Sequence, residues 1–275
     1  MSLEPLHIPN ILQRYHLHPQ KSLGQNFLVD HNALLKIIQA ASLEPTDRVL
    51  EIGAGIGSLT RLLAVNAASV TAVEIDKKFF PVLNDILAPF PNVHLIQGNI
   101  LDVTLASLFF EGGYKVVANI PYYITSAVLR HLLEASIKPE RIVLTMQREV
   151  AERILTKDEK MSLLSLSVQV YGEANIASQI PASCFYPKPE VDSSVLVIDL
   201  YREAKLSDEE LARLFRLAHA AFNQKRKMLR SSLRSVLGDS SGAVSNMLSE
   251  AGIDPRQRPE TLSLGDWIRL TAASK

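Results

Sequence analysis

The chain has 275 residues, of which 47% are hydrophobic, and it carries 29 basic and 29 acidic side chains. A formal net charge of zero excludes a global attraction to nucleic acid or to a membrane surface, so any surface that binds nucleic acid must be local. The single cysteine, Cys184, excludes an internal disulfide and a cysteine-rich metal site.

The first 20 residues predict a loosely ordered, locally basic arm, and they lack the apolar stretch of a signal peptide. No later apolar run is long enough to span a bilayer, so we expect a cytoplasmic protein with no membrane partner. In the next segment, Lys21–Asp30, polar groups are interleaved with apolar side chains that could pack over a pocket. Asp30 is the predicted N-cap of a helix whose apolar positions continue to Ile38.

The segment Arg48–Thr60 predicts a strand, a glycine turn and a helix in succession. Gly53, Gly55 and Gly57 alternate in the turn, and glycine lets a ligand approach the main chain because it has no Cβ. The spacing G-x-G-x-G, with Glu51 before the first glycine, resembles motif I of class I S-adenosylmethionine-dependent methyltransferases, whereas dinucleotide-binding proteins have G-x-G-x-x-G. Taken alone, the turn leaves open a nicotinamide or flavin site and an ordinary tight turn.

Two further predicted strands end near polar side chains. Ser69–Glu74 ends in an acid about 20 residues beyond Gly53, so in a parallel sheet its carboxylate would lie beside the glycine turn and could accept both ribose hydroxyls. A helix-capping or surface acid is the alternative. The strand Val93–Gln97 is followed by Asn99, whose amide could bond the edge of an adenine ring or simply belong to a turn.

The predicted strand Tyr114–Ala118 is followed by the tetrapeptide N-I-P-Y. Within it, Pro121 stiffens the loop and has no N–H of its own. Asn119 places a side-chain carbonyl at the carboxyl end of a strand, where open α/β sheets bind ligands, and Tyr122 adds a flat face. Oxygen acceptors and an aromatic face suit a flipped base with an exocyclic amine, and an ordinary strand-to-helix turn is the alternative.

Strands and helices alternate as far as a last predicted strand, Ser194–Leu200, which indicates a doubly wound sheet. Before it, the proline loop Phe185–Ser193 begins with two aromatic residues. From Ser207 onward the pattern is helical, and Ser207 followed by Glu210 predicts a capping box. A basic stretch in this region could be a solvated helix or a phosphate-binding face, and it contains Lys225, Arg226, Lys227 and Arg230.

Five motifs follow one another in the chain: L-G-Q-N-F-L-V-D, E-I-G-A-G-I-G, N-I-P-Y, F-Y-P-K-P-E-V-D-S and F-N-Q-K-R-K. With these motifs the chain resembles the KsgA-type ribosomal RNA small subunit adenine dimethyltransferases. The resemblance implies a class I S-adenosylmethionine-dependent methyltransferase fold, which is α/β with a Rossmann-like seven-stranded sheet and an antiparallel last strand. It also implies a small C-terminal all-helical domain. We therefore expect a catalytic domain with its N-terminal arm at residues 1–203 and a helical rRNA-binding domain at residues 204–275.

The resemblance also implies roles for individual residues. S-adenosylmethionine would be bound by Asn26, Leu28, Gly53, Gly55, Glu74, Asn99 and Asn119. The target adenine would be held by Asn119, Pro121, Tyr122 and Phe185, and RNA would be contacted by Lys225, Arg226, Lys227 and Arg230. The family usually has Asp where this chain has Asn99; since an amide keeps an acceptor, we expect cofactor affinity to be altered and not lost.

The implied reaction places two methyl groups on N6 of each of two adjacent adenines in the 3′-terminal hairpin of 16S rRNA, during assembly of the 30S subunit. The donor becomes S-adenosylhomocysteine. Because a sulfonium methyl is already electrophilic, we expect no metal, and we expect the protein to be a monomer. The nearest alternative is the 23S rRNA adenine N6-methyltransferase that confers macrolide resistance. A non-catalytic RNA-binding assembly factor on the same fold and a nicotinamide dehydrogenase are further alternatives.

Overall fold

The computed structural model describes residues 3–110, 113–156, 160–224, 226–237 and 242–274. The chain divides into two compact units. The first comprises Met1–Ala151 and Ala174–Leu200, and the second comprises Glu152–Glu173 and Tyr201–Lys275. The second unit therefore includes a segment that precedes the last strand in the sequence. The domain boundary expected between residues 203 and 204 stays a prediction.

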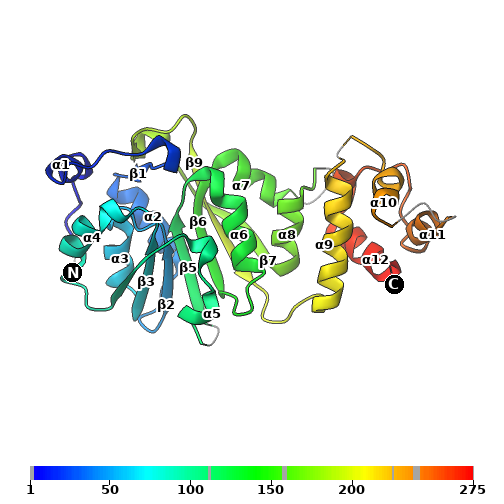
Figure 1. Cartoon of the computed structure of the whole chain (residues 1–275), viewed down its shortest axis with the longest axis horizontal. Helices are drawn as coiled ribbons and strands as arrows, with labels where there is room; N and C mark the ends of the chain where they lie inside the picture. The colour runs from blue at the N-terminus through cyan, green and yellow to red at the C-terminus, as the bar shows by residue number, and fades with distance from the viewer. Residues whose placement is uncertain (1–2, 111–112, 157–159, 225, 238–241, 275) are drawn as a thin grey trace. The chain divides into compact units, whose positions relative to one another are not determined.

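The first unit is built on a seven-stranded sheet with the strand order β4-β3-β2-β5-β6-β9-β7 (Figure 1). The strands are β2 (Arg48–Ile52), β3 (Ser69–Glu74), β4 (Val93–Gln97), β5 (Tyr114–Asn119), β6 (Arg141–Gln147), β7 (Gly172–Ile180) and β9 (Ser193–Leu200). The five strands from β4 to β6 pair in parallel, and β9 pairs with β6 in the antiparallel direction. This topology confirms the expected class I methyltransferase fold with its antiparallel last strand.

The register of the parallel strands brings their carboxyl ends to one edge of the sheet. Ile52 pairs with Val73 on one side and with Ala118 on the other, so the chain leaves β2, β3 and β5 at the same level. From β2 the chain continues to β3 and β4 on one side and then crosses to β5 and β6 on the other. The strand order therefore reverses between β2 and β5, and open α/β sheets bind ligands at such a switch point.

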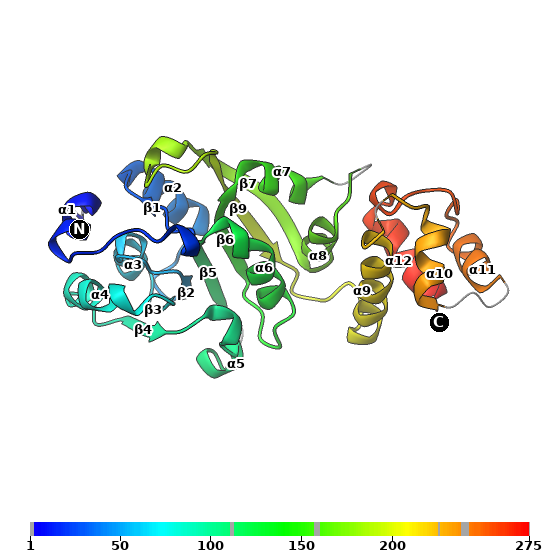
Figure 2. The ribbon, with the colours of Figure 1, turned by 45° about the horizontal axis from the view of Figure 1, so that its top comes forward.

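Helices cover both faces of this sheet. On one face, α2 (His31–Ala41) packs against β5, β6 and β9, and α3 (Ser58–Ala64) packs against β3 and α2. On the opposite face lies α6 (Thr125–Leu133) (Figures 1 and 2). Asp30 caps α2 as predicted, because its side chain accepts a hydrogen bond from the Ala33 N–H at 2.8 Å.

The remaining helical segments are short. The α-helices are α4 (Phe80–Leu87), α5 (Leu105–Leu108) and α7 (Arg148–Leu155), which continues from the first unit into the second. The 3₁₀ turns of the first unit are η1 (Lys21–Leu23), η2 (Lys77–Phe79), η3 (Ile100–Asp102), η4 (Tyr122–Ile124) and η5 (Ala182–Cys184). Three of these turns, η2, η3 and η4, follow a strand of the parallel sheet and shape its carboxyl edge.

The prediction of a loosely ordered N-terminal arm is wrong for part of its length. The segment Ile8–Arg14 forms helix α1, in which Ile8 and Leu12 are buried in the core of the first unit. These two residues are four apart, so they lie on one face of the helix. Pro9 favours a loop in a sequence reading, yet it lies in the first turn of α1, where its missing N–H has no intrahelical acceptor.

A separate two-stranded sheet joins two distant motifs. Strand β1 (Phe27–Leu28) pairs in the antiparallel direction with β8 (Phe185–Tyr186), so that Phe27 lies opposite Tyr186 and Leu28 opposite Phe185. The segment before α2 and the proline loop before β9 therefore lie side by side. Because this pairing is non-local, the sequence gives no signal for it.

The second unit is helical in its described part. It contains α8 (Leu163–Tyr171), α9 (Asp208–Phe222), α10 (Leu229–Leu237), α11 (Ala243–Glu250), η6 (Pro259–Thr261) and α12 (Leu264–Ala273). Its core surrounds the fully buried Trp267, which stacks on Phe222 with ring centroids 5.6 Å apart. The predicted capping box is present, because Ser207 and Glu210 each accept a hydrogen bond from the other's backbone N–H. Within the described ranges, every helix is too short or too polar to cross a membrane.

Candidate active site

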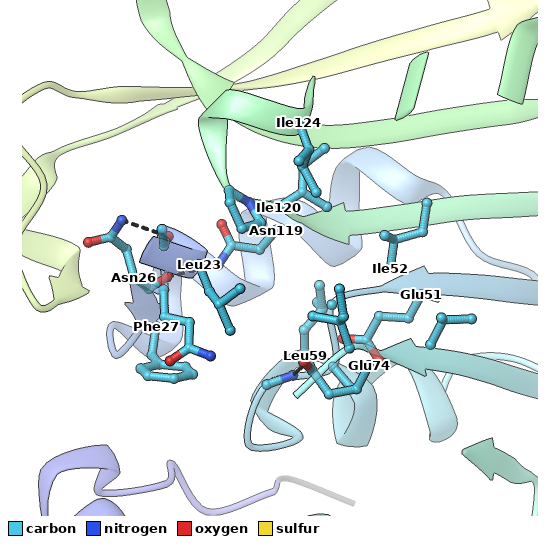
Figure 3. A pocket seen from close by; sticks show the side chains of 18 of the residues that line it. Leu23, Asn26, Phe27, Glu51, Ile52, Leu59, Glu74, Asn119, Ile120 and Ile124 are labelled. Carbon is cyan, nitrogen blue, oxygen red and sulfur yellow. Dashed lines mark hydrogen bonds between the residues drawn. The ribbon is translucent and has the colours of Figure 1, made fainter. Parts of the chain in front are cut away.

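A cavity of about 290 Å³ opens at the carboxyl ends of β2, β3, β4 and β5 in the first unit (Figure 3). Every residue expected to bind the nucleoside or the adenine lines it: Asn26, Leu28, Gly53, Gly55, Glu74, Asn99, Asn119, Pro121, Tyr122 and Phe185. The cavity thus lies at the topological switch point of the sheet. The structure brings these residues together, and their individual roles stay predictions.

Glu74 ends β3 and is 5% exposed. Its Oε2 accepts a hydrogen bond from the Gly55 N–H and its Oε1 accepts one from the Asp76 N–H, both at 2.8 Å. Burial raises the pKa of Glu74 above its ordinary value, and these backbone hydrogen bonds oppose the rise. Each carboxylate oxygen keeps a second lone pair, so Glu74 can still accept both hydroxyls of a diol.

Glu51 lies in β2 and lines the same cavity, but its surroundings differ from those of Glu74. Burial raises the pKa of Glu51 to about 8; the Thr60 hydroxyl opposes this rise and the negative charge of Glu74 adds to it. Neither Glu51 Oε2 nor the Thr60 hydroxyl has a well-formed hydrogen bond to any described group. Burial therefore favours the protonated form of Glu51, while the backbone groups around Glu74 favour its ionised form.

The glycine turn after β2 brings bare backbone to the cavity wall. Gly55 has φ of +57°, a left-handed conformation that glycine adopts without strain. A Cβ at this position would lie 3.2 Å from the ring of Phe27, which itself contacts Phe79 edge to face with centroids 5.5 Å apart. The missing side chain therefore leaves room for the Phe27 ring on one side of the turn. The Gly55 backbone also lines the cavity, where a ligand can approach it.

Asn119 ends β5, and its side chain lies in the cavity (Figure 3). The Asn119 Nδ2 donates to the backbone carbonyl of Asn26 at 3.3 Å, and the Asn26 side chain donates to the carbonyl of Gly24 at 3.1 Å. These contacts connect the N-I-P-Y loop to the segment before β1. Because a protein group engages Nδ2, the Oδ1 of Asn119 is the atom left to accept a hydrogen bond from a ligand.

Two aromatic rings line the cavity near this amide, Tyr122 from η4 and Phe185 from β8. The Tyr122 hydroxyl shares a hydrogen bond with Ser193 Oγ at 2.8 Å, and burial raises the pKa of Tyr122. Phe185 is 4% exposed and is held by its pairing with Leu28. Pro121 restricts the backbone just before Tyr122. The rings are therefore fixed by protein contacts alone.

Asn99 follows β4 and caps η3, where its Oδ1 accepts a hydrogen bond from the Leu101 N–H at 3.2 Å. The two interpretations of this residue, a turn residue and a ligand contact, are compatible, because Asn99 also lines the cavity. The Nδ2 group remains as a donor. An aspartate could form the same cap but would present no donor.

Sequence reasoning missed the glycine and tyrosine at the cavity mouth. Gly24 has φ of +60°, and a Cβ there would lie 3.0 Å from the Cβ of Pro121 and 3.2 Å from the ring of Tyr123. Tyr123 is 65% exposed and also lines the cavity. The glycine within K-S-L-G-Q-N-F was the available signal, since a loop glycine can mark a close approach of two backbones.

Asp76 has more partners than the sequence predicts. It caps η2, since its side chain accepts a hydrogen bond from the Lys78 N–H. Its Oδ2 also accepts hydrogen bonds from the side chains of Gln20 and Gln25, at 2.7 and 3.1 Å. The carboxylate therefore holds the segment before β1 against the end of β3.

The residues expected to contact RNA lie in the second unit. Lys225 lies outside the described residues. Arg226 and Lys227 are exposed in the connection between α9 and α10, and Arg230 is exposed on α10. The basic stretch is not one helix, because α9 ends at Phe222.

No group of three or more histidine, cysteine, aspartate or glutamate side chains in the described part of the chain could hold a metal ion.

A parallel sheet that ends in an antiparallel strand, a glycine turn after β2 and an acid at the end of β3 together define a class I methyltransferase. Comparison with known proteins identifies the family within this class. The family model described as ribosomal RNA adenine dimethylase matches residues 17–274. The chain belongs to this family.

Several curated relatives carry the name ribosomal RNA small subunit methyltransferase A. That of Dehalococcoides mccartyi strain CBDB1 is 42% identical over 261 residues, covering 94% of this chain and 90% of the relative. That of Lactococcus lactis strain IL1403 is 42% identical over 275 residues, covering 96% of this chain and 92% of the relative. That of Enterococcus faecalis is 38% identical over 279 residues, covering 98% of this chain and 95% of the relative.

Solved structures share the fold. The 23S rRNA methyltransferase ErmE has a TM-score of 0.72 at 28% identity, covering 90% of this chain and 98% of ErmE. A dimethyladenosine transferase from Plasmodium falciparum has the same TM-score at 24% identity, covering 88% of this chain and 94% of that chain. Because identity to the small-subunit enzymes is much higher than identity to ErmE, the 23S alternative is not favoured.

We predict that Glu51→Gln stabilises the ligand-free protein increasingly as the pH rises. Burial raises the pKa of Glu51 from 4.5 in the unfolded chain to about 8 in the folded protein. The contribution of Glu51 to the free energy of unfolding is therefore complete below pH 4.5 and is lost as the pH rises to 8. Glutamine does not ionise, so the variant does not lose stability in this way as the pH rises. The melting temperature of Glu51→Gln relative to wild type should therefore increase with pH, by on the order of 5 °C at pH 8.

Thermal unfolding at several pH values between 4.5 and 8.5 measures this difference. Glu44→Gln, which changes an exposed acid before β2, is the matched control and should show no pH-dependent gain. A melting-temperature difference for Glu51→Gln that stays constant across this range would contradict the protonated, buried state of Glu51.

We predict that Gly24→Ala displaces the N-I-P-Y loop. The new Cβ would lie 3.0 Å from Pro121, and alanine at φ of +60° is strained by roughly 1–2 kcal/mol. We expect methyl transfer to fall about tenfold or more, since small displacements of a reacting group are costly. Gly252→Ala is the control, because Gly252 also has a left-handed φ, of +68°, but nothing lies within 4 Å of its Cβ position and it does not line the cavity. Equal activity of the two variants would contradict the role of the close contact.

Proposed function

We propose that this protein transfers methyl groups from S-adenosylmethionine to N6 of two adjacent adenines in the 3′-terminal hairpin of 16S rRNA. The observation that carries the proposal is the position of Asn119, whose Nδ2 donates a hydrogen bond to the Asn26 carbonyl, while Oδ1 accepts none from the described residues and can face a ligand in the cavity. Tyr122 and Phe185 line the same cavity. An acceptor oxygen and aromatic faces suit an adenine amine, and the family supplies the rRNA substrate.

The cavity residues fit the donor. A buried carboxylate with two free lone pairs at Glu74 suits a ribose, and the bare backbone at Gly55 suits a ligand pressed against the turn. Glu74 would hold the ribose and Asn99 the adenine ring; Gly53 and Gly55 would line the methionine portion, while Asn26 and Leu28 would cover it. When bound, S-adenosylmethionine supplies a methyl group that its sulfonium makes electrophilic.

The protein must make the adenine amine a better nucleophile, because its lone pair is delocalised into the ring. Asn119 Oδ1 and the backbone carbonyl of Ile120 would accept the N6 hydrogens, which localises the lone pair and stabilises the charge that develops on nitrogen. The geometry must also hold N6 in line with the methyl carbon at roughly 3 Å. The N-I-P-Y loop would fix both the acceptors and this distance.

Stacking would offset part of the cost of flipping the base. Tyr122 and Phe185 would enclose the ring, at about 1–3 kcal/mol for each stacked base. The Tyr122 hydroxyl already carries its proton at neutral pH and does not serve as the base, since burial raises its pKa above the ordinary value. The side chains of N-I-P-Y include no other titratable group, so we expect the proton to leave to water after methyl transfer.

The helical unit would hold rRNA through its phosphates. Arg226, Lys227 and Arg230 are exposed and belong to a basic stretch with no acid between Phe222 and Arg234. Such side chains bind phosphates without reading sequence. The substrate would be 16S rRNA within the immature 30S subunit, and we propose that the protein acts on it as a monomer in the cytoplasm.

Methylation of naked 16S rRNA, naked 23S rRNA and immature 30S particles, followed by mass-spectrometric mapping of the product, tests the proposal. We expect dimethyladenosine at two adjacent positions near the 3′ end of 16S rRNA. Product on 23S rRNA would instead support the macrolide-resistance type of activity. Tight binding to 30S particles with no methylated product would support a non-catalytic assembly factor.

We predict that Asn119→Ala lowers kcat by about two orders of magnitude or more, because it removes an acceptor that acts on the charge developing in the transition state. Single-turnover methylation of 30S particles measures the effect. The control is Gln97→Ala, which removes an exposed amide at the end of β4 that does not line the cavity. Unchanged turnover in Asn119→Ala would refute the role of this side chain.

We predict that replacing Arg226, Lys227 and Arg230 together with glutamine weakens rRNA binding and flattens its salt dependence. Removing one cation that binds a phosphate should reduce the slope of log K against log salt by about 0.7–0.9. Glutamine at Lys36, Arg202 and Lys205 is the control, since these cations are equally exposed but lie outside the basic stretch. If both triple variants keep the wild-type slope, this surface does not bind phosphates.

A further inference from the structure

The cavity holds two buried carboxyl groups in unlike surroundings. Both oxygens of Glu74 accept backbone hydrogen bonds, from Gly55 and Asp76. Glu51 is only 1% exposed, and its Oε2 has no well-formed hydrogen bond in the part of the chain that the structure describes. Two carboxyls held in such different environments ionise at different pH and can serve different purposes.

The groups that face Glu51 leave it without a positive partner. On β2 it lies between Ala72 of β3 and Val117 of β5, which are its register partners and are apolar. Helix α3 contributes the neutral Thr60 hydroxyl, and β3 contributes the acid Glu74. Burial, the Thr60 hydroxyl and the charge of Glu74 are the causes that shift the pKa of this carboxyl in the described structure, and none of them is a cation.

A buried acid that has neither a well-formed hydrogen bond nor a cation beside it is costly in a folded protein. A purely structural position of this kind is normally filled by an apolar side chain or by an acid whose oxygens are all bonded. Glu51 instead lines the cavity proposed to receive a ligand with an ammonium and a sulfonium. A positive charge placed there would provide the partner that the protein itself does not.

We infer that Glu51 carries a proton in the ligand-free protein and releases it when S-adenosylmethionine binds, so that cofactor binding is coupled to proton release. This inference rests on the proposed function. The O–H bond of the Glu51 carboxyl would break, its proton would pass to the solvent buffer, and the carboxylate would be left to pair with the ammonium of the methionine portion. The ammonium is the partner because Glu51 lies two residues before Gly53, which would line that portion.

The coupling explains how the cavity avoids two neighbouring negative charges before a ligand binds. Ionised Glu51 and Glu74 would repel each other in a site of low dielectric constant, and a neutral Glu51 removes that repulsion. The cation then restores a balanced charge once the ligand is bound. Binding should accordingly be weaker at low pH, where removal of the proton opposes it.

Isothermal titration calorimetry at pH 7, in phosphate and in Tris buffer, measures the proton release. The two buffers have different ionisation enthalpies, so the difference in apparent binding enthalpy counts the protons exchanged. We expect wild type to release close to one proton more per bound S-adenosylmethionine than Glu51→Gln. The comparison also cancels protons exchanged by the ligand's own amino group, whose pKa lies near 7.7–8.0.

Two controls accompany this experiment. Methylthioadenosine lacks both the ammonium and the sulfonium, and its binding to wild type should release no proton through Glu51. Glu44→Gln changes an exposed acid outside the cavity and should behave as wild type. Between pH 6 and 7, the ratio of wild-type to Glu51→Gln affinity for S-adenosylmethionine should rise about tenfold, as expected for one linked proton.

Equal proton exchange in wild type and Glu51→Gln, or an affinity ratio independent of pH, would overturn the inference and leave the proposed function standing. If Glu51→Gln does not fold, the wild-type comparison of S-adenosylmethionine with methylthioadenosine decides, because equal proton release by the two ligands would also overturn it. Failure of S-adenosylmethionine to bind wild type at any pH would overturn the proposed function itself.

Discussion

The in-register pairing of β2, β3 and β5 is the constraint on which the site depends. It places Gly53, Glu74 and Asn119 at one edge of the sheet although they are far apart in the sequence. The hydrogen bond from the Gly55 N–H to Glu74 then fixes the glycine turn against the end of β3. A shift of one residue in either pairing would turn these side chains away from the cavity.

A second group of contacts joins the segment before α2 to the residues at the carboxyl ends of β3 and β5 and to β8. Asn119 donates to Asn26, Asp76 accepts from Gln20 and Gln25, and β1 pairs with β8. These contacts come from a short segment that is not part of the main sheet. They also orient Asn119, since they engage its nitrogen and leave its oxygen for a ligand. The segment before α2 is thus a positioning element as well as a cover.

Sequence reasoning predicted the parts of the fold that local patterns determine. The strands Ser69–Glu74 and Val93–Gln97 have the predicted bounds, and the Asp30 cap is confirmed. The residues expected at the cavity all line it, because strand ends and glycine turns carry strong local signals and the family motifs add those that do not, such as Asn26.

The errors have physical causes. β7 (Gly172–Ile180) was missed because its sequence, G-E-A-N-I-A-S-Q-I, has few strand-forming residues and depends on its neighbours in the sheet. Helix α1 was missed because prolines obscured the burial of Ile8 and Leu12. The contact between Gly24 and Pro121 joins distant segments, so no local pattern could predict it. Ionisation of Glu51 likewise depends on burial, which the sequence does not give.

The most direct test of the account is a crystal structure of the protein with S-adenosylmethionine bound. We expect both ribose hydroxyls within hydrogen-bond distance of the Glu74 carboxylate, and the sulfur-borne methyl directed toward the Asn119 side chain. A nucleoside bound away from the carboxyl edge of β2, β3 and β5, or with its ribose turned from Glu74, would contradict it.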